Sequence, residues 1–170
     1  MHLQIFQQQV LPARDKLYRL ALQLLGDPEE ARDVVQEVLL RIWSSREQLP
    51  EYHHVEAWCM RMARNLCLDK LKAGKVRKAA IPEISRREHA PVTPLQQTEY
   101  RQQRDYLRRV VAMLPEKHRI VWHLRDVEGY SYQEIAGMAG MSLDEVKVNL
   151  FRARKAVKEK LTQIDLYGIP

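Results

Sequence analysis

The sequence has few of the residues that metal proteins, thiol enzymes and disulfide-bonded proteins need. Its only two cysteines, Cys59 and Cys67, lie eight positions apart in an apolar helical pattern, so they cannot bridge within one helix. No residue nearby would activate either thiol as a nucleophile. With His53 and His54, the cysteines also lack the close paired spacings of zinc ligands. We therefore expect no metal site and a reducing, cytoplasmic location.

Glycine-rich loops and long apolar runs are equally scarce. The sequence has six glycines in 170 residues, and none belongs to a Walker or Rossmann phosphate-binding pattern. No apolar run approaches the ~20 residues that cross a bilayer, and the N-terminus lacks a signal-peptide pattern. These absences predict no catalytic activity of its own, no cofactor and no direct insertion into a membrane.

Positive charge, by contrast, is in excess. Lys and Arg number 28 against 22 Asp and Glu, which gives a net charge of +6 and a pI near 9.4. Such a balance favours an anionic partner, with nucleic acid as the first candidate. The expected fold class is all-α, with two small helical domains at residues 1–73 and 98–165. A flexible linker at residues 74–97, with a basic run and three prolines, is expected to join them.

The first domain is expected to hold three helices. An apolar pattern at residues 3–25 ends at Gly26, a suitable C-terminal cap, and Asp27 begins the next helix. On that second helix, residues 28–44, the apolar face consists of Val34, Val35, Val38, Leu39, Ile42 and Trp43. Leu40 lies among polar residues instead, which indicates a protein-binding surface. The alternative is an isolated exposed leucine, which is common.

The third helix of this domain, residues 56–72, follows an expected loop at residues 50–55. One side of this helix carries Arg61, Arg64, Asn65, Asp69 and Lys72, with Trp58 at its border. Cations that track phosphate, an amide that reads base edges and an aromatic ring that stacks on bases suit a single nucleic-acid strand. The alternative interpretation is an ordinary solvated face.

Residues 131–161 predict a helix-turn-helix. Two pairs have the spacing of helix-capping boxes: Ser131 with Glu134, and Ser142 with Glu145. Gly137 and Gly140 are expected to bracket the turn. The second helix has its apolar residues at Val146, Leu150, Ala153, Val157 and Leu161. Its opposite face is wide and basic and suits the DNA major groove, although a solvated face of a bundle helix is the alternative.

Three motifs, taken in order, resemble the extracytoplasmic-function (ECF) sigma factors, the compact promoter-specificity subunits of bacterial RNA polymerase. ARDVVQEVLLRIW, residues 31–43, resembles the helix that binds core polymerase. WCMRMARNLCLDKLK, residues 58–72, resembles the promoter-melting segment. The third motif extends from LPEKHRIVWHLRDVEGYSYQEIAGMAGMS, residues 114–142, through VKVNLFRARKAVKEKL, residues 146–161. The resemblance covers nearly the whole chain and implies a factor that directs polymerase to promoters and helps to melt the minus-ten element.

The resemblance also implies roles for particular residues. The clamp helices of core RNA polymerase would meet Asp33, Gln36, Glu37, Leu40 and Arg41. The melted strand of the minus-ten element would meet Tyr52, His53, His54, Trp58, Arg61, Arg64 and Asn65, with Asn65 capturing a flipped base. Duplex promoter DNA at the minus-thirty-five element would meet Lys147, Val148, Asn149, Phe151, Arg152 and Lys155. The linker would run toward the polymerase active-site cleft, and an anti-sigma factor, often membrane-bound in this family, would be a further partner.

Two other classes of function remain open from the residues alone. A stand-alone helix-turn-helix regulator would need only the second domain and would leave the motifs of the first without a purpose. A helical module that binds only protein would not need to bind DNA, so the basic faces of residues 56–72 and of the helix-turn-helix would be ordinary solvated surfaces. Association with core polymerase separates the first alternative from a sigma factor, and binding to promoter DNA separates the second.

Overall fold

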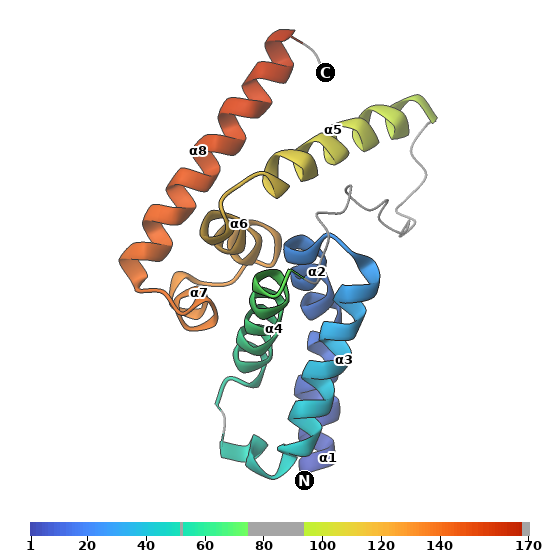
Figure 1. Cartoon of the computed structure of the whole chain (residues 1–170), viewed down its shortest axis with the longest axis vertical. Helices are drawn as coiled ribbons and strands as arrows, with labels where there is room; N and C mark the ends of the chain where they lie inside the picture. The colour runs from blue at the N-terminus through green and yellow to red at the C-terminus, as the bar shows by residue number, and fades with distance from the viewer. Residues whose placement is uncertain (52, 75–93, 168–170) are drawn as a thin grey trace.

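The computed structural model describes residues 1–51, 53–74 and 94–167, the last range with side chains from residue 98 to residue 163. All regular secondary structure in these ranges is helical, in agreement with the expected fold class. Figure 1 shows two groups of helices, an N-terminal lobe from α1 to α4 and a C-terminal lobe from α5 to α8. Tyr52 and most of the expected linker, residues 75–93, lie outside the described residues.

The N-terminal lobe opens with an almost continuous helical run. α1 (His2–Ile5) leads into a π-helical turn, η1 (Phe6–Val10), a 3₁₀ turn, η2 (Leu11–Ala13), and then α2 (Arg14–Leu25). The change of helical type coincides with Pro12, which has no N–H to donate to the preceding turn. α2 ends as expected at Gly26, whose left-handed φ of 69° lets its N–H bond to the Leu22 carbonyl.

The two longer helices of this lobe are α3 (Pro28–Ser44) and α4 (Val55–Lys72). Asp27 caps α3 by accepting hydrogen bonds from the backbone N–H groups of Glu29 and Glu30. Between the helices, η3 (Arg46–Glu51) is a 3₁₀ helix that includes Pro50. The expected loop at residues 50–55 is therefore shorter, because both of its ends are helical.

The C-terminal lobe contains α5 (Pro94–Ala112), α6 (Glu116–Trp122), the π-helical turn η4 (His123–Val127), α7 (Tyr132–Ala139) and α8 (Leu143–Tyr167). α5 begins at Pro94, within the residues expected to be linker, because proline is well tolerated in the first turn of a helix. The helical part of the lobe thus starts four residues before the expected boundary at residue 98.

The helix-turn-helix forms as expected, with one correction. Ser131 and Glu134 form a complete capping box at the start of α7, and Ser142 and Glu145 do the same at the start of α8. Gly140 ends α7 with a φ of 63°. The expectation that Gly137 would also lie in the turn was wrong, because α7 continues through it. The turn is therefore tighter than expected.

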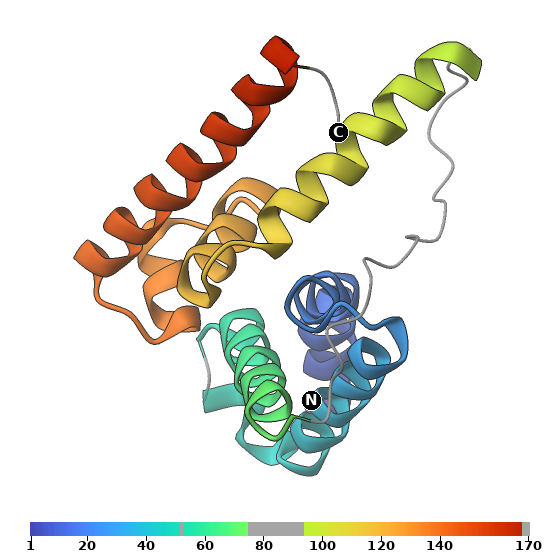
Figure 2. The same cartoon turned by 45° about the horizontal axis from the view of Figure 1, so that its top comes forward.

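The hydrophobic cores of the two lobes are continuous. α4 lies beside α7 in both views, with α2 next to α6 (Figures 1 and 2). One cluster of buried side chains joins Leu17, Met60 and Cys67 of the first lobe to Ile135 and Met138 of the second. A smaller cluster holds α5 against α8 through residues that include Val110, Val111 and Val157. The two lobes are therefore packed together in this structure rather than held apart.

Replacing Ser131 with alanine should destabilise the C-terminal lobe by about 1 kcal/mol, because the start of α7 loses its side-chain cap. Chemical denaturation followed by circular dichroism measures the change. Ser131→Thr keeps the hydroxyl acceptor and should lose less than half as much. Equal losses for the two variants would contradict a capping role for the hydroxyl.

Candidate nucleic-acid interface

The exposed face of α8 is the most clearly formed candidate surface. Val146, Leu150 and Ala153 are buried beneath it, so the helix cannot rotate without exposing them. All but one of the residues predicted for the minus-thirty-five element are exposed, and Asn149 is partly exposed; they are Lys147, Val148, Asn149, Phe151, Arg152 and Lys155. Phe151 is 69% exposed, which a side chain needed only for packing would not be. All six side chains are therefore accessible to some degree, and their contacts with the minus-thirty-five element stay predictions.

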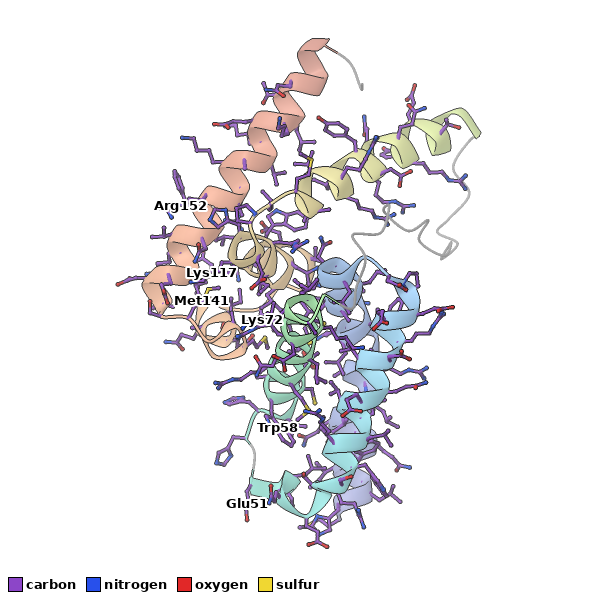
Figure 3. The ribbon with its side chains drawn as sticks, viewed as in Figure 1. Glu51, Trp58, Lys72, Lys117, Met141 and Arg152 are labelled. Carbon is purple, nitrogen blue, oxygen red and sulfur yellow. The ribbon has the colours of Figure 1, made fainter. Side chains whose placement is uncertain are left out.

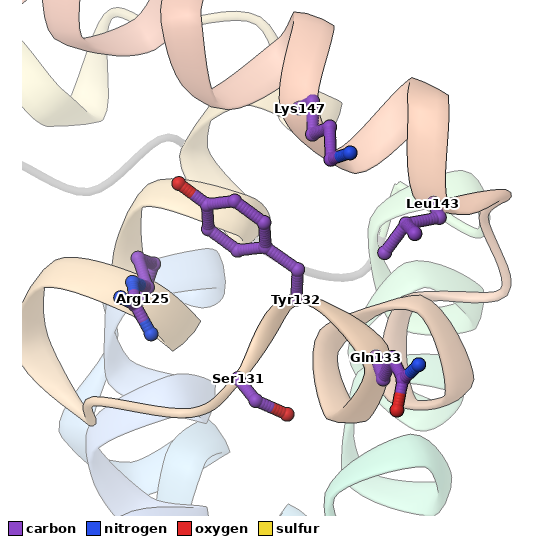
Figure 4. A pocket seen from close by; sticks show the side chains of 6 residues that line it. All are labelled: Arg125, Ser131, Tyr132, Gln133, Leu143 and Lys147. Carbon is purple, nitrogen blue, oxygen red and sulfur yellow. The ribbon is translucent and has the colours of Figure 1, made fainter.

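A hollow of about 410 Å³ lies along one edge of this surface, between α8 and the start of α7. Figure 4 shows Lys147 of α8 above it and Arg125 at its far side, with Tyr132 between them. The Arg125 guanidinium lies 5.0 Å from the Tyr132 ring centroid and donates to the Tyr130 carbonyl, 2.8 Å away. Two cations thus flank the N-terminal end of a helix, which favours an anion such as phosphate.

A second hollow of about 720 Å³ lies along the other edge of α8, against the start of α6. Lys117 and His118 line it from α6, and Arg152 lines it from α8. Lys117 and Arg152 are labelled in Figure 3. Burial and the nearby Arg152 charge lower the pKa of His118. Lys117, His118 and Arg125 were not predicted as site residues, although Lys117 and His118 lie in the first turn of α6, just after Pro115 and Glu116. Only the fold brings these residues to the edges of α8.

The second candidate surface lies on α4, away from the α2 and α3 side. Arg61 and Asn65 are exposed on it, and so are His53 and His54 just before the helix. Trp58 is partly buried and packs against the core, with its position near the N-terminal half of α4 visible in Figure 3. The exposed residues are accessible to a nucleic-acid strand, and their contacts with the minus-ten element stay predictions. The contribution of Tyr52 lies outside the described residues.

Arg64 differs from its neighbours on α4. Its guanidinium donates to the backbone carbonyl of Met138 in the C-terminal lobe, with a separation of 3.1 Å. Burial, and next the nearby Arg61 charge, lower the pKa of Arg64. The Nε of this guanidinium is buried without a hydrogen-bond partner. The sequence predicts Arg64 among the residues that meet the melted strand, whereas in this structure it lies at the contact between the lobes.

The polar face of α3 forms the third candidate surface. Asp33, Gln36, Glu37, Leu40 and Arg41 are all exposed, and Leu40 reaches 63% exposure. Arg41 Nε donates to Glu37 Oε1 over 2.6 Å, and this hydrogen bond holds the two charged side chains next to each other on the exposed face of α3. Trp43, expected within the apolar face, is instead 38% exposed and makes an edge contact with Phe6. Leu40 and Trp43 together give this end of α3 an apolar part.

Metal and thiol chemistry find no support in the described part of the chain. No group of three or more His, Cys, Asp or Glu side chains there could hold a metal ion. Burial raises the pKa of both Cys59 and Cys67 to about 12. Within the same residues, no helix is long and apolar enough to span a membrane.

Comparison with known proteins matches both lobes to one family. Residues 10–77 match the model of sigma-70 region 2, and residues 104–157 match that of sigma-70 region 4. The RNA polymerase sigma-E factor of Streptomyces coelicolor is 32% identical over 95% of this chain and 88% of its own length. The ECF RNA polymerase sigma factor SigL of Mycobacterium tuberculosis is 30% identical over 87% of this chain and 84% of its own. The chain belongs to the ECF sigma factor family.

Other relatives agree with this assignment. The ECF RNA polymerase sigma factor SigE of Mycolicibacterium smegmatis is 32% identical over 88% of this ECF sigma factor, which spans 58% of that relative's length. The sigma factor RpoE of Bartonella quintana, solved with the anti-sigma factor NepR, has a TM-score of 0.75 at 20% identity, over 92% of this chain and 96% of that one. CnrH, solved with the cytosolic domain of CnrY, has a TM-score of 0.63 at 20% identity, over 94% and 88%. Both structures share the fold.

Neither cysteine thiol should react readily in the native protein. With a pKa of about 12, roughly one thiol in 10⁴ is ionised at pH 8, and both sulfurs are buried. We expect a chromogenic disulfide reagent to label neither cysteine within minutes in buffer and both in denaturant. Rapid labelling of Cys59 or Cys67 without denaturant would contradict their structural role.

Proposed function

We propose that this ECF sigma factor binds core RNA polymerase, directs it to specific promoters and helps to melt the minus-ten element. The observation that carries the proposal is the pair of basic helical faces, one on α4 and one on α8, in the lobes that match regions 2 and 4. Each face is suited to a different form of DNA. The chain itself provides binding and positioning, and the chemistry of RNA synthesis belongs to the polymerase.

α8 suits duplex DNA at the minus-thirty-five element. A helix with its side chains is ~10–12 Å across and fits the major groove, which is ~12 Å wide. With α8 inserted, the two strands that border the groove would pass along the hollows on either side of it. Arg125 with Lys147, and Lys117 with Arg152, would then meet phosphates, while Val148, Asn149 and Phe151 would face base edges.

α4 suits a single strand at the minus-ten element. Asn65 has an amide that can bond to the edge of an unpaired base, and Arg61 on the preceding turn can meet the adjoining phosphate. Because only the open strand presents these groups, the contacts would favour melting. His53 and His54 would border the same base. Trp58 would support this surface from the core side.

The exposed face of α3 is our candidate for the polymerase contact. Leu40, with the charges of Asp33, Glu37 and Arg41 around it, has the composition of a small protein interface, with an apolar centre and a polar rim. This role would place the protein in the cytoplasm with the polymerase. The complex of the structural relative RpoE with the anti-sigma factor NepR supports a similar regulatory partner for this chain.

The family assignment disfavours a stand-alone helix-turn-helix regulator, because such a protein would have no use for region 2. The experiment that tests the proposal is reconstitution with core polymerase and genomic DNA, followed by sequencing of the transcript starts. Transcripts from a shared class of promoter support a sigma factor. Failure to co-elute with core polymerase and to direct any initiation would contradict the proposal.

Asn65→Ala should abolish or strongly reduce open-complex formation while polymerase binding is unchanged, because the side chain is exposed and lies on α4, away from α3. Permanganate reactivity of the promoter measures melting, and co-elution measures polymerase binding. Asp69→Ala, one turn further along the same exposed side, serves as the control and should melt normally. Unchanged reactivity with Asn65→Ala would remove this residue from the melting site.

Arg152→Ala should weaken binding of the minus-thirty-five duplex by about 1–3 kcal/mol if it contacts base edges, and less and without sequence preference if it contacts only phosphate. Holoenzyme binding to matched and scrambled duplexes measures both quantities. Arg154→Ala is the control, since Arg154 lies on the same helix but pairs with Asp126 over 2.6 Å. Equal effects of the two substitutions would argue against a specific role for Arg152.

A further inference from the structure

Two apolar side chains lie among the cations on the exposed face of α8. Val148 is 46% exposed and Phe151 is 69% exposed, with Lys147 and Arg152 at the adjacent positions. Because they are three residues apart on a helix, Val148 and Phe151 are neighbours in successive turns. The buried side chains that hold α8 in the two hydrophobic clusters are different ones: Val146, Leu150, Ala153 and Val157. The pair is therefore accessible apolar surface in a basic setting.

Val148 is the side chain of this pair that would reach furthest into a major groove. At ~100° per residue, it lies almost opposite the side of α8 that Val146 and Leu150 bury. Phe151 lies one turn further along the helix and about 60° to one side. Lys147 lines the smaller hollow beside α8 and Arg152 lines the larger one. With the cations directed to the two strands, Val148 would face the base edges between them.

Polar side chains beside Val148 are already engaged within the protein. Asn149 is partly buried, and its Nδ2 donates to Met141 Sδ, 3.7 Å away. Glu145, one turn earlier, accepts from the backbone N–H of Ser142 over 2.8 Å. Asn149 would have to exchange its bond with Met141 for one with a base, whereas Val148 is accessible as it stands. Apolar contact is therefore the most direct form of base readout at this position.

The chemistry of the major groove decides which base such a side chain favours. Thymine presents a C5-methyl group there, while guanine, adenine and cytosine present hydrogen-bond donors and acceptors. A valine placed against a polar edge removes that edge from water without giving it a partner, which costs free energy. A valine placed against a methyl group buries apolar surface on both sides, which is favourable. Val148 and Phe151 therefore favour thymine.

The spacing of the two side chains suits base pairs that are close together. Three residues correspond to ~4.5 Å along the helix axis at 1.5 Å per residue. Successive base pairs are ~3.4 Å apart along the duplex. The two side chains would thus meet base pairs one or two steps apart.

We propose that Val148 is a specificity-determining residue that, together with Phe151, recognises the C5-methyl groups of thymines at neighbouring base pairs of the minus-thirty-five duplex. This inference rests on the proposed function, because it names the base chemistry that the same face of α8 reads. It adds sequence information to the contacts of the cations, since contacts with phosphate position a protein on DNA but do not distinguish bases.

Replacement of thymine with uracil tests the proposal, because uracil pairs in the same way and lacks only the methyl group. The probe is the promoter fragment with the strongest transcript start in the reconstitution with genomic DNA, in which deoxyuridine replaces each thymine of the minus-thirty-five element in turn, on either strand. Holoenzyme made with the full chain is the binding partner. We expect one or two of the replacements to weaken wild-type binding roughly fourfold each, the effect of burying one methyl-sized group.

The variants assign each methyl group to a side chain. Val148→Ala should bind the thymine and uracil forms almost equally at one of the sensitive positions, and Phe151→Ala should do so at the other or at the same one. Val127→Ala is the matched control, because Val127 is also 46% exposed but lies in η4, outside α8. This control should keep the full uracil effect.

Three results would overturn the proposal: a minus-thirty-five element without thymine, uracil replacements that leave wild-type binding unchanged, or a uracil effect that persists in both Val148→Ala and Phe151→Ala. Each of them leaves the proposed function intact, because the wild-type holoenzyme would still bind and initiate. A wild-type holoenzyme that initiates nowhere would instead contradict the proposed function, and this inference with it.

Discussion

The packing of α4 determines how the rest of the molecule is arranged. This helix buries Cys59, Ala63 and Cys67 completely, and it lies between its own lobe and α7. Only a narrow part of its surface is left for other purposes, and that part carries Arg61 and Asn65. A helix that is covered on two sides has no rotational freedom, so the positions of its exposed side chains are set by the core. The same logic holds for α8, which is fixed by Val146 and Leu150 below and presents Phe151 above.

The sequence predicts those parts of the fold that depend on neighbouring residues. Helix caps at Asp27, Ser131 and Ser142 act within three residues, and all were identified correctly. The exposure of Leu40 followed from its place on a helical wheel, and it is confirmed at 63%. The assignment of residues to the polymerase, the minus-ten element and the minus-thirty-five element came from the family resemblance, and these roles remain predictions. The turn predicted at Gly137 was wrong because glycine is compatible with a turn but does not require one, and of Gly137 and Gly140 it is Gly140 that adopts positive φ.

What the sequence could not predict depends on contacts between distant segments. Arg64 and Met138 are 74 positions apart, and Arg19 and Glu128 are 109 apart, so no local pattern relates them. Lys117 and Arg125 look like ordinary helix cations until the fold places them beside α8. The prediction of two helical domains left their packing open, and the fold shows that Ile135 and Met138 are buried in one cluster with Leu17 and Met60. Burial patterns show that a face is apolar, but not which helix covers it.

The contact between the lobes combines apolar and polar interactions. Ile135 and Met138 are buried in the same cluster as Leu17 and Met60, and the Arg19–Glu128 and Tyr130–Glu56 hydrogen bonds also cross between the lobes. Contacts between domains of one chain are usually more polar than a permanent core. Here the apolar side chains of α4 and α7 bring the two helices together, and the hydrogen bond from Arg64 to the Met138 carbonyl follows from that packing.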